Sequence, residues 1–372
     1  MAKLGDIATY INGYAFKPED WSDEGVRIIR IQDLSGNSYQ TNRYNGPYAP
    51  KYEVNDGDVL ISWSASLGVY IWHGEKAVLN QHIFKVVFDK VEVDKSFFVH
   101  QVGEILEKAV ISAHGATMKH LTKPVFDALP FYLPPIDEQR CIASILDKVT
   151  DLITKRRTQL EKLDLLVKSR FVEMFGTERD FSKWNIAKVE DVAEVCVGVV
   201  IKPSQYYAEV GIKAFRSLNI GVMNVKNSDW VYFSEEGHLK NAKSTVHEGD
   251  ILVVRSGAPG TACVVTKEYD GCNAVDIIIA RPNSKKINSV FLAAFTNYPH
   301  GMNQIQKGTG GAAQQHFNVG QYKTMQIILP PLDLQNEFAL YFHQTETTKS
   351  NIQKSLETLE TLKKALMQEY FG

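Results

Sequence analysis

The chain contains a long internal repeat. The segment from Leu133 to Gly176 aligns without a gap on the segment from Leu329 to Gly372, and about a third of the paired residues are identical. Such a repeat decides the architecture before any single motif does, because each copy is expected to fold in the same way. The sequence therefore predicts a tandem duplication.

The repeat extends upstream of these two segments. Further towards the N-terminus, VNDGDVLIS from Val54 pairs with VHEGDILVV from Val246, and Arg30 falls near Arg216. The opening LGDIATYINGY similarly echoes VEDVAEVCVGV, which begins at Val189. Each half is thus a variable domain followed by a helix. A shared G-A-x-x-x-H-[LF] motif consists of Gly115, Ala116, His120 and Leu121 in the first half and of Gly311, Ala312, His316 and Phe317 in the second.

The C-terminal piece of each half is predicted to be one long helix. After Pro134-Pro135 and Pro330-Pro331 neither piece contains another proline, and apolar residues recur at steps of three and four. A helix of about 38 residues is roughly 57 Å long, and its narrow apolar seam needs a partner. Because the two helices are related by the repeat, an antiparallel coiled coil is the simplest arrangement. In the alternative, each helix packs only on its own domain.

Each variable part is predicted to be an α+β domain. Short apolar runs between Gly, Asn, Asp and Pro residues are typical of strands, and two segments have helical spacing. The predicted strands are Val26–Ile31, Asp58–Ser62, His82–Phe88, Asp250–Val254 and Val275–Ala280, and the predicted helices are Phe97–Ser112 and Ser289–Gln306. The fold class is therefore α+β, with two pseudo-symmetric globular domains (1–134 and 177–330) joined by two long antiparallel helices (135–176 and 331–372).

Length and charge limit the possible functions. The 372 residues exceed what one core usually supports, so two domains are expected. A net charge of -2 argues against autonomous nucleic-acid binding, which usually needs a basic excess. Without a membrane-spanning run or a signal-peptide core, a cytoplasmic location is expected. No metal site is predicted, because the four cysteines lack ordered spacing. They are Cys141, Cys196, Cys263 and Cys272.

Two globular domains on a helical spacer, each helix entered by paired prolines and a D-x-Q sequence, resemble the specificity subunits of type I restriction-modification systems. The resemblance covers essentially the whole chain. It is carried by LPPIDEQRCIASILD, LPPLDLQNEFALYF, the repeated G-A-x-x-x-H-[LF] motif and the DGDVLIS and EGDILVV strands. One position departs from the pattern, since Leu334 stands where the first half has Glu138.

The resemblance implies a subunit without a catalytic centre. Its two target-recognition domains would read a split double-stranded DNA sequence, one half-site each, and the helical spacer would fix the number of unread base pairs. The implied partners are two adenine-N6 methyltransferase subunits and the ATP-dependent motor-nuclease (restriction) subunits, with no membrane. S-adenosylmethionine and ATP with magnesium would belong to these partners, and no cofactor to this chain.

Motifs of the corresponding enzymes are missing from the sequence. The nearest string to the methyltransferase motif [DNS]-P-P-[YF] is Asn297-Tyr298-Pro299-His300, which has the wrong residues. The glycine-rich run at Gly308, Gly310 and Gly311 lacks the G-K-[ST] ending of a phosphate-binding loop. Two rival interpretations stay open: a DNA-modifying enzyme with unrecognised motifs, and a coiled-coil scaffold that binds only protein.

Polar residues at related points of the two halves are the predicted DNA contacts. Arginine and amide side chains form paired hydrogen bonds with guanine and adenine in the major groove. A structural role is the alternative: Arg30 and Arg216 would pair with local carboxylates, and Trp63 would belong to the core. The candidates are Arg30, Gln32, Asp33, Trp63, Ser64, Lys119 and His120 in the first half and Arg216, Asn219, Arg255, Ser256, Gln314, Gln315 and His316 in the second. The basic run Lys155–Arg157 is a further candidate for phosphate or partner contact.

Overall fold

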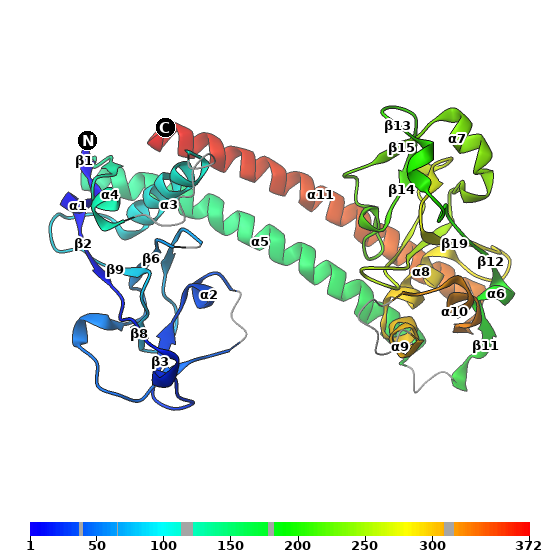
Figure 1. The fold of residues 1–372 in the computed structure, drawn as a ribbon, viewed down its shortest axis with the longest axis horizontal. Helices are drawn as coiled ribbons and strands as arrows, with labels where there is room; N and C mark the ends of the chain where they lie inside the picture. Colours follow the sequence, from blue (N-terminus) through cyan, green and yellow to red (C-terminus); the bar gives the residue numbers. More distant parts are fainter. Residues whose placement is uncertain (37–39, 65, 113–121, 178–181, 309–315) are drawn as a thin grey trace. The chain divides into compact units, whose positions relative to one another are not determined.

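A computed structural model describes residues 1–36, 40–64, 66–112, 122–177, 182–308 and 316–372 (Figure 1). The chain divides into two compact units. Unit 1 contains Met1–Arg157 and Lys354–Gly372, and unit 2 contains Thr158–Gln353. Each unit therefore combines one globular part with a portion of each long helix.

In the described part of unit 1, most of the β structure lies in two four-stranded sheets. The first is antiparallel, whereas the second contains one parallel pair, β3 with β8. The first sheet has the order β2 (Thr9–Asn12), β9 (Ile83–Val87), β6 (Val59–Ser62), β7 (Gly68–Ile71); the second has the order β4 (Arg43–Tyr44), β3 (Val26–Ile29), β8 (Ala77–Leu79), β5 (Glu53–Val54). A separate pair joins β1 (Ala2–Lys3) to β10 (Pro130–Phe131).

Unit 2 repeats most of this arrangement in its described residues. The antiparallel sheet has the corresponding strand order, and the second sheet again contains one parallel pair, β14 with β18. The first sheet is β12 (Ala193–Val197), β19 (Ile277–Pro282), β16 (Ile251–Val254), β17 (Ala262–Val264); the second is β13 (Tyr207–Ala208), β15 (Val231–Phe233), β14 (Ile212–Phe215), β18 (Asn273–Ala274); and β11 (Asn185–Lys188) pairs with β20 (Gln326–Leu329). The second sheets share the order β4-β3-β8 and β15-β14-β18, but the fourth strand lies beside β8 in unit 1 and beside β15 in unit 2. The topology of the first sheets and of these three strands thus confirms the predicted duplication.

Short helices complete both units. In unit 1 they are α1 (Leu4–Ile7), α2 (Ile31–Leu34), α3 (Lys95–Ser112) and α4 (Lys123–Asp127), and in unit 2 they are α6 (Val189–Val192), α7 (Glu235–Lys240), α8 (Ser289–Asn297), α9 (Pro299–Gly308) and α10 (Val319–Thr324). The 3-10 turns are Pro18–Asp20, Pro50–Tyr52, Pro203–Tyr206, Ser217–Asn219, Ala242–Ser244 and Lys267–Tyr269. α3 agrees with the predicted helix to within two residues.

The helix predicted from Ser289 to Gln306 is wrong in one respect, because the structure divides it into α8 and α9. The break falls at Tyr298, whose backbone is extended (φ -94°, ψ 174°) immediately before Pro299. Proline disfavours a helical conformation in the residue before it and has no backbone N–H to continue the ladder. The helix was predicted from the spacing of apolar residues alone, which does not take account of Pro299.

The D-x-Q sequence after each proline pair has a structural explanation. Gln139, at the start of α5 (Ile136–Phe175), donates from Nε2 to the carbonyl of Pro134 (2.7 Å) and accepts from the backbone N–H of Asp94 (2.9 Å). Gln335, at the start of α11 (Leu332–Phe371), makes the same bonds to Pro330 (2.8 Å) and Asn288 (2.9 Å). Both glutamines are buried, so each one ties the entry of a long helix to the globular part.

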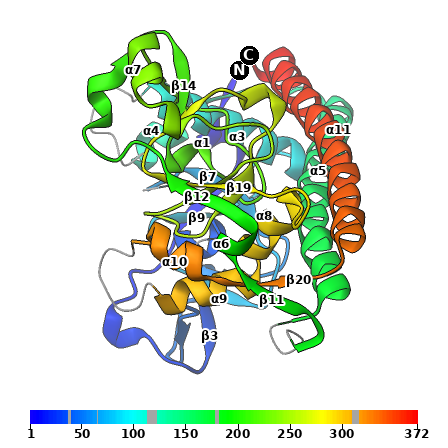
Figure 2. The same ribbon diagram turned by 90° about the vertical axis from the view of Figure 1, so that its right-hand side faces the viewer.

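Within unit 1, parts of α5 and α11 pack together in the core. Leu146 of α5 and Met367 of α11 belong to the same buried cluster as Phe97, and the ring of Phe371 lies 5.4 Å from that of Phe97. Towards the other end of this segment, Arg157 pairs with Glu360. Because lower numbers in α5 lie beside higher numbers in α11, the two segments run antiparallel (Figure 2).

Within unit 2, the remaining parts of the two helices also run antiparallel. Phe171 of α5 contacts Phe338 of α11 with ring centroids 5.2 Å apart, and Lys349 binds Asp164 at 2.7 Å. Phe171 also stacks on Phe291 in the core of unit 2. The alternative in which each helix packs only on its own domain is therefore wrong, since each helix contributes to both cores. Among the described residues, no helix is long and apolar enough to cross a membrane.

Candidate nucleic-acid interface

Arg30 and Arg216 occupy equivalent places in the two units. Arg30 follows β3 and Arg216 follows β14, the two strands that each pair in parallel with a partner strand. The next turn is built in the same way in both units. The backbone N–H of Arg30 donates to the Asp33 carboxylate, and that of Arg216 donates to the Asn219 amide oxygen, both at 2.9 Å. The repeat thus gives the two arginines the same local backbone structure, one in each unit.

The two guanidinium groups are held by local oxygens. Arg30 lies 3.6 Å from the carboxylate of Asp33 and donates to the carbonyl of Gln40 at 2.7 Å. Arg216 donates instead to the carbonyl of Asp229. The predicted alternative, pairing with a local carboxylate, therefore describes Arg30 but not Arg216. Both side chains remain half-buried at a strand end.

Gln32, Asp33 and Asn219 differ sharply in accessibility. The Asp33 side chain is 1% exposed and also binds Arg27 at 3.1 Å, while Asn219 is fully buried and donates to the carbonyl of Ser228 at 2.6 Å. These contacts assign Asp33 and Asn219 to the framework of the turn. Gln32, in α2, is exposed at the surface of unit 1.

A second polar cluster in unit 2 surrounds Arg255, which directly follows β16. The Arg255 side chain, 11% exposed, pairs with Asp276 and donates to His316 Nε2 at 2.7 Å. Ser256 Oγ lies 2.8 Å from His316 Nδ1. A guanidinium has only donors, so Nε2 must accept, which leaves the histidine proton on Nδ1 for donation to Ser256. The cluster therefore brings together three predicted residues, Arg255, Ser256 and His316.

The equivalent place in unit 1 holds an aromatic residue. Trp63 follows β6, donates from Nε1 to Asn12 at 3.1 Å, and stacks on Phe84 with ring centroids 5.6 Å apart. Its ring also lies 4.9 Å from that of His82. Trp63 is half-buried, so it packs on the core and still reaches the surface, whereas Ser64 is buried.

Sequence reasoning missed Asp276, His82 and Asn12, which complete these clusters. Asp276 and His82 have positive φ (+51° and +71°), a conformation that is uncommon for residues other than glycine and is enriched at functional sites. Asp276 interrupts the apolar run from Ala274 to Ala280. That charge inside a strand-like run was the available signal for this residue.

Within each unit, the strand-end arginine and the second cluster follow strands of two different sheets, and a backbone hydrogen bond brings the two segments close together. Val275 donates to the carbonyl of Phe215, which places Asp276 near the turn that begins at Arg216. In unit 1, Asn80 donates in the same way to Ile29, next to Arg30. The two clusters of a unit are treated together as its candidate polar surface. Four candidates, Lys119, His120, Gln314 and Gln315, lie outside the described residues, as does most of the glycine-rich run.

The basic run on α5 has acidic neighbours on the helices. Lys155 pairs with Asp151 and Arg157 with Glu360, both at 2.6 Å. In the described ranges, no group of three His, Cys, Asp or Glu side chains is placed to hold a metal ion. Burial raises the pKa of the Cys272 thiol to about 11 and that of Cys263 to about 12, so both thiols are protonated at neutral pH.

The model of the family described as type I restriction modification DNA specificity domain matches residues 1–162 and 182–361. The chain belongs to this family. Among specificity subunits, it is 25% identical to that of the type I restriction enzyme EcoBI of Escherichia coli, over 95% of this chain and 80% of the relative. It is 23% identical to the MjaVIII specificity subunit of Methanocaldococcus jannaschii, over 84% of this chain and 78% of that relative.

Solved specificity subunits share the fold. The S subunit of a type I restriction-modification system from M. genitalium superposes with a TM-score of 0.60 at 14% identity, over 100% of this chain and 95% of that one. A second chain, from a study of type I complex assembly, gives a TM-score of 0.59. The expected family and the α+β fold with two related globular parts are thereby confirmed. Members of this family are DNA-specificity subunits of multi-subunit restriction-modification systems rather than enzymes in their own right.

Proposed function

We propose that the chain reads a bipartite double-stranded DNA sequence, with one half-site bound by the polar surface of each unit. One observation supports this function above others. Arg30 and Arg216 begin turns with the same backbone hydrogen bond in the two units. The residue after the central strand of the first sheet differs, because it is Trp63 in unit 1 and Arg255 in unit 2. A shared local backbone structure that carries different side chains nearby is suited to binding two different base sequences.

The chemistry of the two surfaces fits contact with base edges. Arginine forms paired hydrogen bonds with guanine, and an exposed amide such as Gln32 pairs with adenine. The Trp63 indole offers an apolar face that suits a thymine methyl group or a sugar. The two surfaces thus differ in the bases that they favour.

Partners complete the proposed function. With a net charge of -2, this chain supplies little of the phosphate neutralisation that tight DNA binding needs. Two adenine-N6 methyltransferase subunits, docked on the globular parts and long helices, would supply it together with S-adenosylmethionine. Motor-nuclease subunits would bring ATP, magnesium and cleavage. The chain itself is proposed to act in the cytoplasm and to carry no cofactor.

The first test is the distribution of N6-methyladenine across the genome of cells that carry the cognate methyltransferase. With this chain present, methylation is expected at one bipartite motif, and without it that motif should be unmethylated. Single-molecule sequencing of both strains measures the result. If methylation were the same in both strains, the protein-scaffold interpretation would replace this proposal.

The second test separates the two half-sites. Arg216→Ala is expected to relax one base position in one half-site and to leave the other half-site unchanged, while Arg30→Ala does the converse. The loss of a paired hydrogen bond to guanine corresponds to about 1–3 kcal/mol, or roughly a 5- to 150-fold loss of discrimination. Methylation of oligonucleotides with each single-base change measures the effect.

Arg140→Ala provides the matched control. Arg140 lies on α5, where its exposed side chain pairs with Glu92 and Asp137. This substitution removes the same charge from a residue that belongs to neither polar surface, so base preference should be preserved. If Arg216→Ala weakened methylation of all oligonucleotides equally, Arg216 would be a phosphate contact or a structural residue instead.

A further inference from the structure

A short loop follows the edge strand of the antiparallel sheet in each unit. In unit 1 it comprises residues 13–18 after β2, and in unit 2 it comprises residues 198–203 after β12. The two loop sequences are GYAFKP and GVVIKP, and each leads into a 3-10 turn at its proline. Both loops therefore belong to the repeat, and they share the glycine and the Lys-Pro pair.

Backbone hydrogen bonds fix the position of both loops. In unit 2, the carbonyl of Val199 accepts from the backbone N–H of Asp276 at 3.1 Å, and Asp276 pairs with Arg255. The equivalent bond in unit 1 runs from the backbone N–H of Gln81 to the carbonyl of Tyr14 at 2.8 Å. The loop of unit 2 therefore lies next to the cluster that contains Arg255, which is part of the candidate polar surface.

The first glycine of each loop permits this close approach. A Cβ atom at Gly198 would overlap the backbone carbonyl of Ala274, and one at Gly13 would overlap that of Asn80. Because glycine has no Cβ atom, the loop can pass against the neighbouring segment without a shift of the backbone. Since the constraint is the same in both units, the two loops leave their edge strands in the same way.

The loop of unit 2 exposes an aliphatic side chain. Ile201 is 78% exposed, and Val200 before it is 48% exposed. Lys202 after it is exposed and has a φ of +44°, a conformation that is uncommon for residues other than glycine and is enriched at functional sites. In unit 1, the equivalent of Ile201 is Phe16, which is only 7% exposed and packs against the ring of Tyr44. The shared fold therefore does not require this position to be exposed.

We infer that the loop of residues 198–203 is a further DNA-contacting element of unit 2, in which Ile201 packs on a thymine methyl group and Lys202 contacts a phosphate. Base edges in the major groove present nitrogen and oxygen atoms, and the thymine methyl group is the apolar group among them. An aliphatic side chain next to the Arg255 cluster thus matches thymine better than any other base. The inference rests on the proposed function, and it adds a base that the half-site of unit 2 should contain.

The two copies of the loop differ in the way that this assignment requires. A lysine occupies the same position in both, Lys17 and Lys202, and phosphates are the same in every base sequence. The exposed large hydrophobic side chain differs, because it is Tyr14, at 43% exposed, in unit 1 and Ile201 in unit 2. A shared phosphate contact beside a variable hydrophobic contact is suited to two half-sites of different sequence.

The test uses the full chain with its cognate methyltransferase and duplexes in which the thymines of the recognised sequence are replaced by deoxyuridine one at a time. This replacement removes only the methyl group. With the unmodified chain, one thymine in one half-site should be sensitive, and its replacement should lower the methylation rate by about fourfold or more. Ile201→Ser should methylate the thymine duplex more slowly and should be insensitive to deoxyuridine at that position.

Val210→Ser is the matched control. Val210 is 84% exposed and precedes β14, whereas Arg216 follows this strand, so Val210 lies at the other end of it. This variant should keep the full sensitivity to deoxyuridine. The inference would be overturned if Ile201→Ser kept that sensitivity too, or if it slowed the methylation of every duplex equally. A chain that conferred no bipartite methylation at all would overturn the proposed function, and the inference with it.

Lys202→Asn tests the phosphate contact, because asparagine removes the charge and tolerates a positive φ. The complex with the methyltransferase should bind all duplexes more weakly by the same factor. The slope of log affinity against log salt concentration should decrease in magnitude by about 0.9, the value for one phosphate contact. Fluorescence anisotropy of a labelled duplex at several salt concentrations measures both effects. An unchanged slope would contradict the contact.

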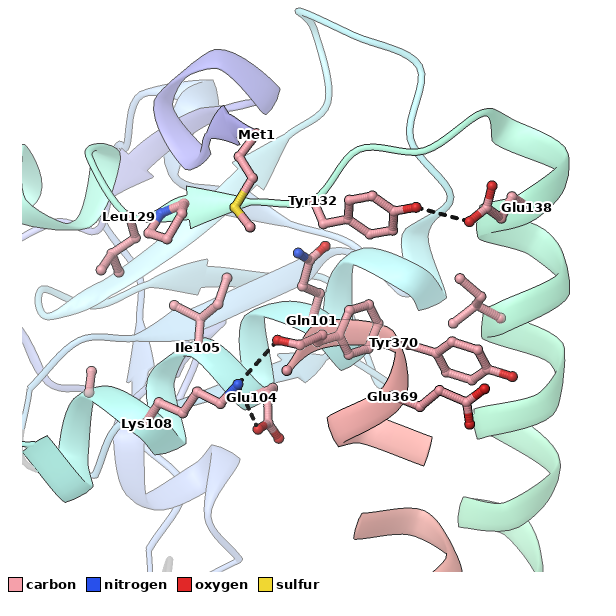
Figure 3. A pocket seen from close by; sticks show the side chains of 15 residues that line it. Met1, Gln101, Glu104, Ile105, Lys108, Leu129, Tyr132, Glu138, Glu369 and Tyr370 are labelled. Atoms are coloured by element: carbon pink, nitrogen blue, oxygen red, sulfur yellow. Dashed lines mark hydrogen bonds and ion pairs between the residues drawn. The ribbon is translucent and has the colours of Figure 1, made fainter. Parts of the chain in front are cut away.

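Lys108→Gln is the control for the loss of charge. Lys108 lies on α3 in unit 1, beside a pocket at the last turn of α11 (Figure 3). There it pairs with Glu104 at 3.3 Å and donates to the carbonyl of Phe371 at 3.1 Å. Because Lys108 belongs to neither polar surface, its substitution should preserve the salt dependence. An equal decrease in slope for both lysine variants would show a general effect of charge and overturn the assignment of Lys202.

Discussion

Insertion of one heptad into both long helices is expected to lengthen the unread gap of the recognised sequence by about three base pairs. Seven residues add about 10.5 Å to a helix at 1.5 Å per residue. Base pairs are spaced about 3.4 Å apart along the duplex. A heptad also changes the phase of a helix by only about 20°, so the two units should keep their orientation. The expected change in the methylated sites is complete. The variant would methylate a new set of sites, and the original sites would be unmethylated.

The insertions belong after Arg157 in α5 and after Gln353 in α11, where the chain passes between the two units. Both units then keep their internal helix contacts, such as Phe171 with Phe338 in unit 2. Genome-wide detection of N6-methyladenine measures the spacing, and both half-sequences should be unaltered. A three-residue insertion at the same points is the control, because it changes the helix phase and should abolish methylation. Active protein with the original spacing would contradict the idea that the helices act as a ruler.

The duplicated architecture was predictable because a repeat constrains every element at once. Gln139 and Gln335 illustrate this. Their shared spacing after a proline pair marked them in the sequence, and in both units the amide joins a helix entry to the backbone of the preceding domain. Equivalent residues lie in equivalent surroundings, so the same hydrogen bonds form in both units. Where the two copies differ, the repeat carried no information.

The sharing of the long helices between units could not be predicted from periodicity. Residues at steps of three and four identify an apolar face, but they do not tell which core covers it. Phe171 and Leu146 lie on the same helix, yet each belongs to a different unit. The division of the chain into four parts at residues 134, 176 and 330 therefore stays a prediction from the sequence. The structure divides the chain into two compact units instead of four consecutive segments.

The candidate site was predictable in part. The sequence did not show which of the candidate side chains are buried. Arg255, Ser256 and His316 come together because an antiparallel bridge joins residues 256 and 316. Asp33 and Asn219 have the residue types of base-reading side chains, but short turns also need such side chains to cap backbone N–H groups. Sequence alone does not distinguish these two uses. The buried side chains of Asp33 and Asn219 favour the capping role.

Phe171→Ala is expected to destabilise unit 2 by about 3–5 kcal/mol, the usual cost of removing a buried phenylalanine ring. Phe171 is fully buried and contacts the rings of Phe175, Phe291 and Phe338. For a unit of this size, the loss corresponds to a decrease in Tm of roughly 6–20 °C. Differential scanning calorimetry measures it. The substitution tests whether α5 is part of the core of unit 2, since a free spacer helix would lose little.

Two further substitutions make this test specific. Leu165→Ala, on the same helix but 63% exposed, should change stability by less than about 0.5 kcal/mol. Met367 is the repeat counterpart of Phe171, so Met367→Ala should destabilise unit 1 by about 2–5 kcal/mol. If Phe171→Ala and Met367→Ala lower the same single transition, the two units unfold together, because each long helix belongs to both cores. If Phe171→Ala were as mild as Leu165→Ala, the helix would contribute no core to unit 2.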